Sequence, residues 1–271
     1  MRENIIRKKL AEGKTLMGMG VFTGSPVIVE MMGYSGLDFI FLETEHTPMP
    51  IATELRNLIA IANSAGLGVI CRVKYNDEVM IRQALEFGAD AVVVPHCRTA
   101  EDVRRMVRSA KFPPDGVRGA ASDVRAAHYG CGPDFNYQQF LKKTNEEVMC
   151  IALAEDPEFF ENMDEILSVP GLSAVSLGPS DLSLALGNPD TYNLDMPEVR
   201  IRFEKLYAAA KARGIPVMGP IAPPTYERLK QMKENGLRLA ILRNDITNFR
   251  NTLKGIVDNV VTPIRQEESG Q

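Results

Sequence analysis

Eight short and almost wholly apolar runs alternate with longer amphipathic stretches along this chain of 271 residues. The runs show no apolar–polar alternation, so both faces of each predicted strand are expected to be covered by other parts of the protein. The predicted strands are residues 16–20, 39–42, 69–73, 91–94, 148–154, 174–177, 215–218 and 239–242. The predicted helices between them include residues 51–65, 78–87, 100–110, 159–169, 197–213 and 226–235.

This order predicts an α/β fold, closed as a (β/α)8 TIM barrel, because eight strand–helix units in a chain of about this length are typical of that barrel. Gly88, Gly214 and Gly236 each follow a predicted helix, as glycines that end helices in the left-handed conformation do. The competing fold is an open doubly wound sheet. It usually has a GxGxxG loop after its first strand, and residues 21–26 do not match that pattern.

We expect one domain over residues 1–271, with the barrel from about 14 to 260. A short helix over residues 4–12 should precede it, and a frayed polar tail should begin at Gln266. The net charge of −4 and the lack of a basic run argue against a nucleic-acid partner. No apolar run reaches the roughly 18 residues that a membrane span needs. Four cysteines without CxxC spacing, and an N-terminus unlike a signal peptide, favour a cytoplasmic location.

Titratable side chains gather where the predicted strands end. In a TIM barrel the reactive residues come from the carboxyl ends of the strands, which share one rim. A functional site is therefore expected from the residues at these ends, which are Glu43, Glu45, His46, Arg72, His96, Glu155, Asp181 and Arg243.

Glu155 and Asp181 each follow an apolar run, and about one strand–helix–strand unit separates them. They should therefore lie side by side at the rim, where their oxygens could hold a divalent cation. The plainer alternative is that each acid caps a helix or lies in a surface loop.

Arg72 lies inside an apolar run, where a charge is costly unless it is paired or bound to substrate. Its structural alternative is an ion pair with Glu43 or Glu45. His46 directly follows Glu45, and an adjacent acid would orient an imidazole and raise its basicity, as a general base requires. His46 could equally be a loop histidine with ordinary hydrogen bonds. For His96 the sequence allows either a functional or a structural role.

At these residues the chain resembles the class II 2-oxo-acid aldolase family typified by 4-hydroxy-2-oxoheptane-1,7-dioate aldolase. The resemblance extends from about residue 16 to residue 256. The matching segments are residues 36–39, Glu45-His46, residues 72–77, residues 113–119, Glu155 with residues 161–167, and Gly-Pro-Ser-Asp-Leu-Ser at 178–183.

The resemblance implies a barrel of the phosphoenolpyruvate/pyruvate-binding type in a homo-oligomer, commonly a hexamer with a helix exchanged between subunits. It implies a metal-dependent lyase that cleaves a 4-hydroxy-2-oxo acid to pyruvate and an aldehyde through a pyruvate enolate. The cation would be Mg²⁺ or Mn²⁺, with Co²⁺ or Zn²⁺ as alternatives, and Glu155 and Asp181 would be its ligands.

The resemblance also implies a role for each remaining site residue. Arg72 would hold the enolate oxygen, His46 would be the acid/base, and Glu86 would support that histidine from a neighbouring position. The backbone around Gly178, Pro179 and Ser180 would clasp the carboxylate of the oxo acid.

Five positions depart from the family pattern. Gly20 replaces a tryptophan, Glu43 an aspartate, Leu153 a glutamine, His96 a methionine and Arg243 a glycine. Arg243 and His96 would be new polar contacts, so we expect a shifted and more anionic substrate.

The alternatives are a decarboxylase or a CoA-thioester lyase with the same enolate chemistry, or a non-catalytic relative that binds an oxo acid. Lys74 lies two residues after Arg72 and is a weak signal for Schiff-base chemistry instead.

Overall fold

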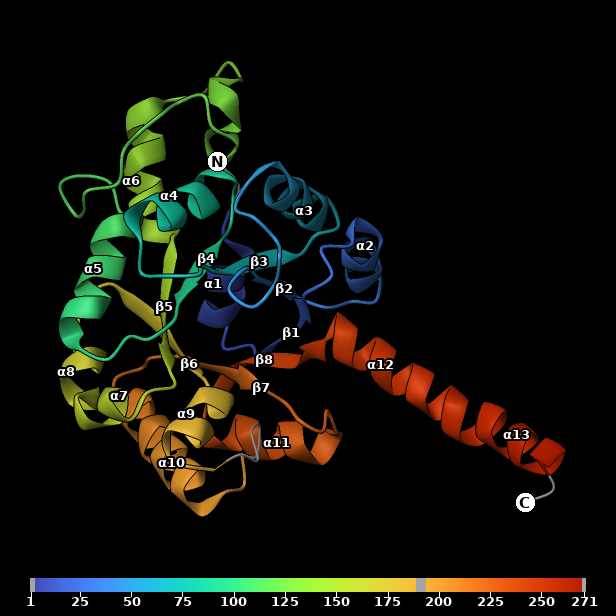
Figure 1. The fold of residues 1–271 in the computed structure, drawn as a ribbon. Coiled ribbons are helices and arrows are strands. Elements are labelled where there is room, and N and C mark those ends of the chain that lie inside the picture. The colour runs from blue at the N-terminus through green and yellow to red at the C-terminus, as the bar shows by residue number, and fades with distance from the viewer. Residues whose placement is uncertain (1–2, 189–193, 270–271) are drawn as a thin grey trace.

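The computed structural model describes residues 3–188 and 194–269, and within them eight parallel strands close into a barrel in sequence order (Figure 1). The first strand pairs with the last, which closes the barrel. This order confirms the predicted TIM barrel and excludes the open doubly wound sheet. The strands are β1 (Leu16–Val21), β2 (Phe39–Glu43), β3 (Gly68–Arg72), β4 (Ala91–Val94), β5 (Met149–Ala154), β6 (Leu172–Leu177), β7 (Val217–Pro220) and β8 (Leu237–Asn244).

Helices surround the barrel, and local sequence fixes where several of them begin and end. Asp77 and Thr225 accept a backbone N–H of the first turn, and Thr99 forms a capping box with Asp102. The helices are α1 (Ile5–Ala11), α2 (Pro26–Tyr34), α3 (Thr53–Ser64), α4 (Glu78–Glu86), α5 (Ala100–Ala110), η1 (Arg125–Gly130), α6 (Tyr137–Glu147), α7 (Pro157–Glu161), α8 (Met163–Leu167), α9 (Pro179–Ala185), α10 (Pro197–Ala212), α11 (Tyr226–Asn235), α12 (Asp245–Ile256), η2 (Val257–Val261) and α13 (Thr262–Ser269). Gly88, Gly214 and Gly236 have positive φ, as predicted for glycines after a helix.

Two apolar layers hold the fold together. One fills the barrel interior with alternate residues of the strands, such as Phe39, Ile70 and Ile151. The other packs the outward residues of the strands against the helices. The interior is closed at its N-terminal end by α1, where Ile6 packs so tightly on Gly68 that a Cβ at that glycine would overlap it.

Some boundaries differ from the prediction. The last two strands are Val217–Pro220 and Leu237–Asn244, where residues 215–218 and 239–242 were expected. The expected helix over 159–169 is two short helices, α7 and α8, which meet at Asn162. The tail that was expected to be frayed from Gln266 is helical in its described part, where α13 continues to Ser269.

The C-terminal segment α12–η2–α13 leaves the barrel and extends into solvent as an arm (Figure 1). Its root is fixed by Asp245, whose carboxylate accepts the backbone N–H groups of Phe22 and Thr23. Large apolar side chains lie exposed along the arm, among them Phe249, Val260 and Ile264. No helix in the described residues is long and apolar enough to cross a membrane.

Candidate active site at the barrel mouth

Most of the rim residues predicted from the sequence meet around one cavity of about 260 Å³ at the carboxyl ends of the strands, but Glu45 and His96 are not part of its described lining. Its wall includes Glu43, His46, Arg72, Leu153, Glu155, Gly178, Pro179, Ser180, Asp181 and Arg243. The closed barrel brings these side chains together although they come from different strands or the loops that follow them.

Arg72 is paired with acids from the neighbouring strand and its loop. Glu43 lies beside Arg72 in the strand register, and the Nε of Arg72 donates to Oε2 of Glu43 at 2.6 Å. The Nη1 of Arg72 lies 3.2 Å from Oε2 of Glu45. Both expected ion pairs are therefore present, and Arg72 still lines the cavity, so the structural and the functional interpretation hold together.

Glu43 also shapes the loop that carries the histidine. Its carboxylate is fully buried, and its Oε1 accepts the backbone N–H of Glu45 at 2.7 Å and of His46 at 3.2 Å. The Nε2 of His46 lies 3.8 Å from Oε2 of Glu45, and its side chain is 58% exposed. Burial raises the pKa of Glu45, although the charge of Arg72 opposes this shift. The loop thus presents an accessible imidazole beside an acid.

Glu155 directly follows β5 and is 2% exposed. Burial raises the pKa of its carboxyl to about 7, the N–H of His96 opposes the shift, and the charge of Asp181 adds to it. Asp181 lies in the first turn of α9 and lines the same cavity. A buried carboxylate beside a second acid is the arrangement that a cation stabilises, because it removes their mutual repulsion.

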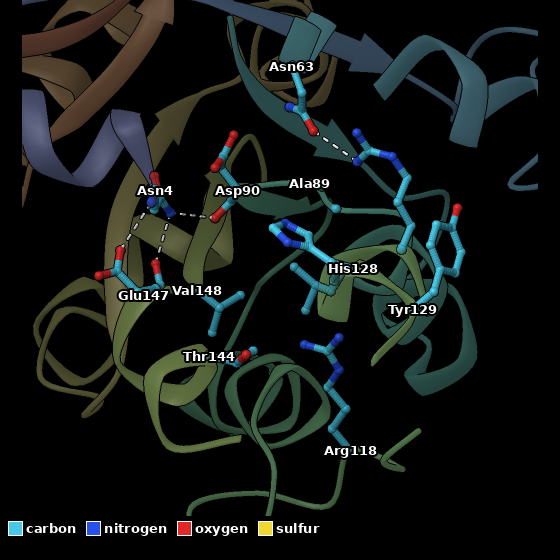
Figure 2. Close-up of a pocket in the computed structure, with 14 residues that line it drawn as sticks. Asn4, Asn63, Ala89, Asp90, Arg118, His128, Tyr129, Thr144, Glu147 and Val148 are labelled. Atoms are coloured by element: carbon cyan, nitrogen blue, oxygen red, sulfur yellow. Dashed lines mark hydrogen bonds between the residues drawn. The ribbon is translucent and has the colours of Figure 1, made fainter. Parts of the chain in front are cut away.

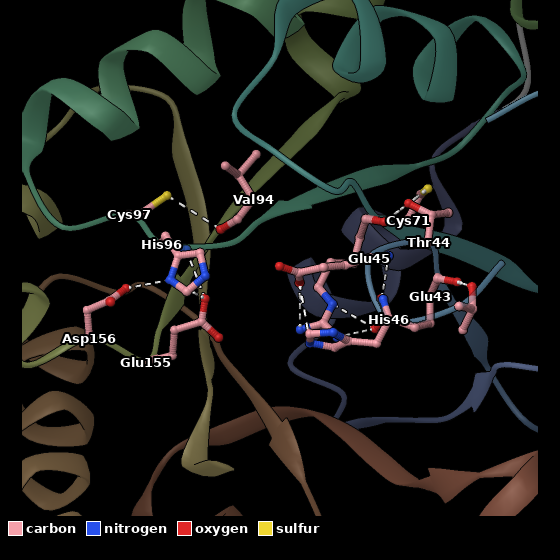
Figure 3. A network of polar contacts seen from close by, with 12 residues as sticks. Glu43, Thr44, Glu45, His46, Cys71, Val94, His96, Cys97, Glu155 and Asp156 are labelled. Carbon is pink, nitrogen blue, oxygen red and sulfur yellow. Dashed lines mark hydrogen bonds and ion pairs between the residues drawn. The ribbon is translucent and has the colours of Figure 1, made fainter. Parts of the chain in front are cut away.

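His96 contacts both Glu155 and Asp156 (Figure 3). Its backbone N–H donates to Oε1 of Glu155 at 2.9 Å, and its Nδ1 lies 3.0 Å from Oδ2 of Asp156. Burial acts to lower the pKa of His96, but the hydrogen bond to Asp156 and the charge of Glu155 outweigh it and raise the pKa. One ligand atom from each of these three residues lies within 4.8 Å of the others, which makes them a second candidate set for a metal ion.

Asp156 was not predicted as a site residue. It directly follows Glu155 in the sequence, and that adjacency was the available signal. The Nη2 of Arg98 lies 2.8 Å from Oδ1 of Asp156, so this acid is tied to a cation as well as to His96.

Two sequence-derived candidates lie elsewhere in the described chain. Glu86 ends α4 and faces Arg82 at 4.0 Å, whereas His46 follows the carboxyl end of β2. Helix α4 starts near the mouth after β3 and returns toward the start of β4, so its last residue lies at the opposite end of the barrel. Within one chain, therefore, Glu86 does not support His46 as expected. Lys74 is absent from the described lining of the cavity, which removes support for Schiff-base chemistry there.

The altered wall positions have physical explanations. A Cβ at Gly20 would lie 2.9 Å from the Cβ of Asn244, so β1 and β8 leave no room for a larger residue. Leu153 presents an apolar surface to the cavity. Arg243 lines the cavity with a left-handed backbone, φ 64°, which favours glycine. It has no ion-pair partner in the described part of the chain, so it contributes an uncompensated positive charge to the mouth.

The sequence and the fold of this chain are both similar to those of one family of known proteins. The model of the HpcH/HpaI aldolase/citrate lyase family matches residues 17–251. A 5-keto-4-deoxy-D-glucarate aldolase of Citrobacter koseri is 30% identical over 255 residues, which cover 94% of this chain and 95% of the relative. An HpcH/HpaI aldolase of Desulfitobacterium hafniense has a TM-score of 0.83 at 29% identity, covering 92% of this chain and 94% of its own. A Burkholderia cenocepacia family protein has a TM-score of 0.85 at 25% identity, with 95% and 99% covered.

Proposed function

Because the chain belongs to the HpcH/HpaI aldolase/citrate lyase family, we propose that it is a metal-dependent aldolase that cleaves a 4-hydroxy-2-oxo acid to pyruvate and an aldehyde. The observation that supports this most is the convergence of Glu155, Asp181, Arg72 and His46 on one cavity. We expect the enzyme to work in the cytoplasm on small molecules, without a nucleic-acid partner.

The mouth fits a divalent cation. Glu155 is a buried acid whose pKa is raised to about 7, with Asp181 beside it, so two hard oxygen donors meet where burial disfavours uncompensated negative charge. We assign Glu155 and Asp181 as ligands for Mg²⁺ or Mn²⁺. His96 and Asp156 are the adjoining donors, and an imidazole nitrogen among them would favour Co²⁺ or Zn²⁺ instead. When bound, the cation supplies Lewis acidity that polarises the carbonyl oxygen of the oxo acid.

Arg72 is assigned to the oxygen of the enolate that forms when the C–C bond breaks. Its guanidinium is held by Glu43 and Glu45 before substrate arrives, so little reorganisation is needed when charge develops. Such preorganised donors are typically worth about 3–4 kcal/mol in the transition state.

His46 is assigned as the acid/base that moves the proton of the 4-hydroxyl group. Its exposed imidazole lines the cavity, and Glu45 lies close enough to orient it. The role predicted for Glu86 requires a neighbouring subunit, because Glu86 and His46 lie apart within one chain. The backbone N–H groups after Gly178 and Pro179, at Ser180 and Asp181, are assigned to the carboxylate of the oxo acid.

The arm supplies the argument for an oligomer. Its apolar side chains have no cover in the described chain, and a second copy presents the same arm for exchange. We propose a homo-oligomer in which arms pack on neighbouring barrels, with the hexamer as the expected assembly. An assembly of this kind is required if Glu86 of one subunit is to reach His46 of another.

Exchange of the pyruvate methyl protons in D₂O tests the proposal without knowledge of the aldehyde. We expect Mg²⁺- or Mn²⁺-loaded protein to exchange these protons, EDTA-treated protein to lose the exchange, and added metal to restore it. An Asp181→Asn variant should fail to recover with metal. Exchange that persists fully in EDTA-treated protein or in this variant would overturn the metal assignment.

Product analysis separates the alternatives. A decarboxylase would release CO₂ from an oxo acid, a CoA-thioester lyase would require the thioester, and an aldolase would release an aldehyde. A non-catalytic relative would bind pyruvate with metal present and exchange no protons.

A further inference from the structure

A second cavity, of about 360 Å³, lies at the end of the barrel opposite to the mouth. Asp90 and Val148 line it, and they precede β4 and β5, which places it at the amino ends of these strands. Its other walls come from the end of α3, the end of α4, η1, α6 and Asn4 before α1 (Figure 2). The volume is within the range of small-molecule sites.

The side chain of Arg118 has hydrogen-bond donors in this cavity that no residue of the described chain accepts. Arg118 is 2% exposed, and the only hydrogen bond of its side chain in the described structure is a long one of 3.5 Å from Nη1 to the carbonyl of Ala110. Nε and Nη2 are buried and have no acceptor. The guanidinium lies 4.5 Å from the ring centroid of Phe112 and points into the cavity (Figure 2). A buried cation with two unused donors is unfavourable unless an acceptor is supplied.

Asn63 is a second residue of the cavity with an unused donor. Its Oδ1 accepts from Nη1 of Arg125 at 2.9 Å, which fixes the orientation of the amide. Its Nδ2 is buried and has no acceptor in the described chain. The cavity is therefore lined by donors on two sides, and an acceptor-rich ligand is what both lack.

The acids of the cavity are already engaged. Oδ2 of Asp90 accepts the N–H of Val69 at 2.8 Å, and Oε2 of Glu147 accepts the N–H of Asn4 at 3.3 Å. Figure 2 shows these acids grouped with Asn4, on the side away from His128 and Arg118. Burial lowers the pKa of Arg118 to about 10, while the charge of Glu86 opposes the shift, so the guanidinium remains positive at neutral pH. One side of the cavity is thus cationic.

We propose that this cavity is a binding site for a small-molecule oxyanion, in which a carboxylate or phosphate group accepts hydrogen bonds from Nε and Nη2 of Arg118. A guanidinium fork matches both groups in two-point geometry. Asn63 donates to a further acceptor of the same molecule. Within one chain the site is separate from the barrel mouth, and it does not depend on the aldolase assignment.

Calorimetric titration of the EDTA-treated full chain with inorganic phosphate, and separately with succinate, tests this. We expect saturable binding near one anion per chain for at least one probe, and the preferred probe identifies phosphate or carboxylate as the recognised group. Arg118→Lys should weaken this binding at least tenfold, because the two-point fork is lost. Asn63→Asp should weaken it similarly, since it keeps the acceptor for Arg125 but replaces the free donor with a negative charge.

Arg243→Gln is the matched control, because it removes an arginine from the mouth instead. The site is supported if Arg243→Gln binds the anion as tightly as wild type while Arg118→Lys and Asn63→Asp both lose affinity for it. A crystal structure with the bound probe should show it against Arg118. The proposal fails if neither probe binds, if binding follows Arg243, or if the crystal shows the cavity filled by an acid of a neighbouring copy.

Discussion

Arg72 and Glu43 show how one pair of side chains serves both stability and reactivity. The guanidinium is held by acids on β2 and in its loop, and the second oxygen of Glu43 holds the backbone of Glu45 and His46. The carboxylate of Glu43 therefore fixes both the guanidinium of Arg72 and the backbone of the loop that presents His46.

Replacement of Arg72 by alanine should lower turnover by about 10²–10³-fold, because a preorganised donor to the developing enolate charge is lost. Metal affinity should change little, since Arg72 is not assigned as a ligand. Rates of pyruvate methyl exchange and calorimetric metal titration measure the two effects. Arg202→Ala is the control, because Arg202 is half-buried on α10 and is not part of the described lining of the mouth. Full exchange in Arg72→Ala would contradict the assignment.

Glu155 should make the metal-free protein respond to pH in an unusual direction. Its folded pKa of about 7 lies above the ordinary value of 4.5. Between these values the folded state holds a proton that the unfolded state has released, so this residue's contribution to stability falls as pH rises and is constant above 7. Comparison of wild type and Glu155→Gln by thermal unfolding at pH 5 and pH 8 checks this. Glu155→Gln should lose less stability than wild type between pH 5 and pH 8. Equal losses in the two proteins would count against a raised pKa of Glu155.

At the level of elements, β1 and β8 approach each other closely because Gly20 has no side chain. A Cβ at this position would lie 2.9 Å from Asn244 and 3.1 Å from the ring of Phe22. Phe22 directly follows β1 and lines the mouth, so an aromatic ring is present there two residues after Gly20.

Gly20→Trp should destabilise the barrel, because overpacking a tight contact typically costs about 1–3 kcal/mol. Urea unfolding of the metal-free protein measures the change in free energy. Gly255→Ala in α12 is a suitable control, because no neighbouring segment lies within 4 Å of the methyl group that it would add, and alanine favours a helix by about 1 kcal/mol. A Gly20→Trp variant as stable as wild type would show that β1 and β8 adjust freely.

At the scale of the whole molecule, the arm is the part of the fold that a single chain leaves incomplete. Phe249 is 65% exposed and Val260 is 60% exposed, although both lie on a helical segment with further apolar neighbours. Burying such side chains stabilises an interface by roughly 25 cal/mol per Å² of apolar surface. An isolated monomer would therefore expose an unusually apolar surface.

A double substitution, Phe249→Asp with Val260→Asp, should convert the assembly to smaller species, because each charge would be buried unpaired in the interface. Sedimentation velocity measures the change. Glu267→Lys, also on the arm but polar in wild type, is the control. An unchanged sedimentation coefficient in the double variant would refute the proposed role of the arm.

The barrel could be predicted from the apolar pattern alone, because eight apolar runs covered on both faces, with helices between them, have few other ways to be buried. It also identified most of the mouth, because residues at the carboxyl ends of parallel strands must share one rim. Glu86 could not be placed in this way, since a residue at the end of a helix lies at the far end of the barrel. Side-chain partners, such as Asp156 on His96, depended on loop geometry that no periodicity records.

Only the tertiary structure revealed the cavity around Arg118. Its walls come from segments far apart in the sequence, and nothing in the local pattern indicates that this arginine is buried without an acceptor. The same holds for the arm, whose apolar residues are ordinary for a helix until the fold leaves them uncovered. Local sequence sets the type of element and the face that it buries, whereas burial, pairing and unmet hydrogen bonds depend on which distant segments meet.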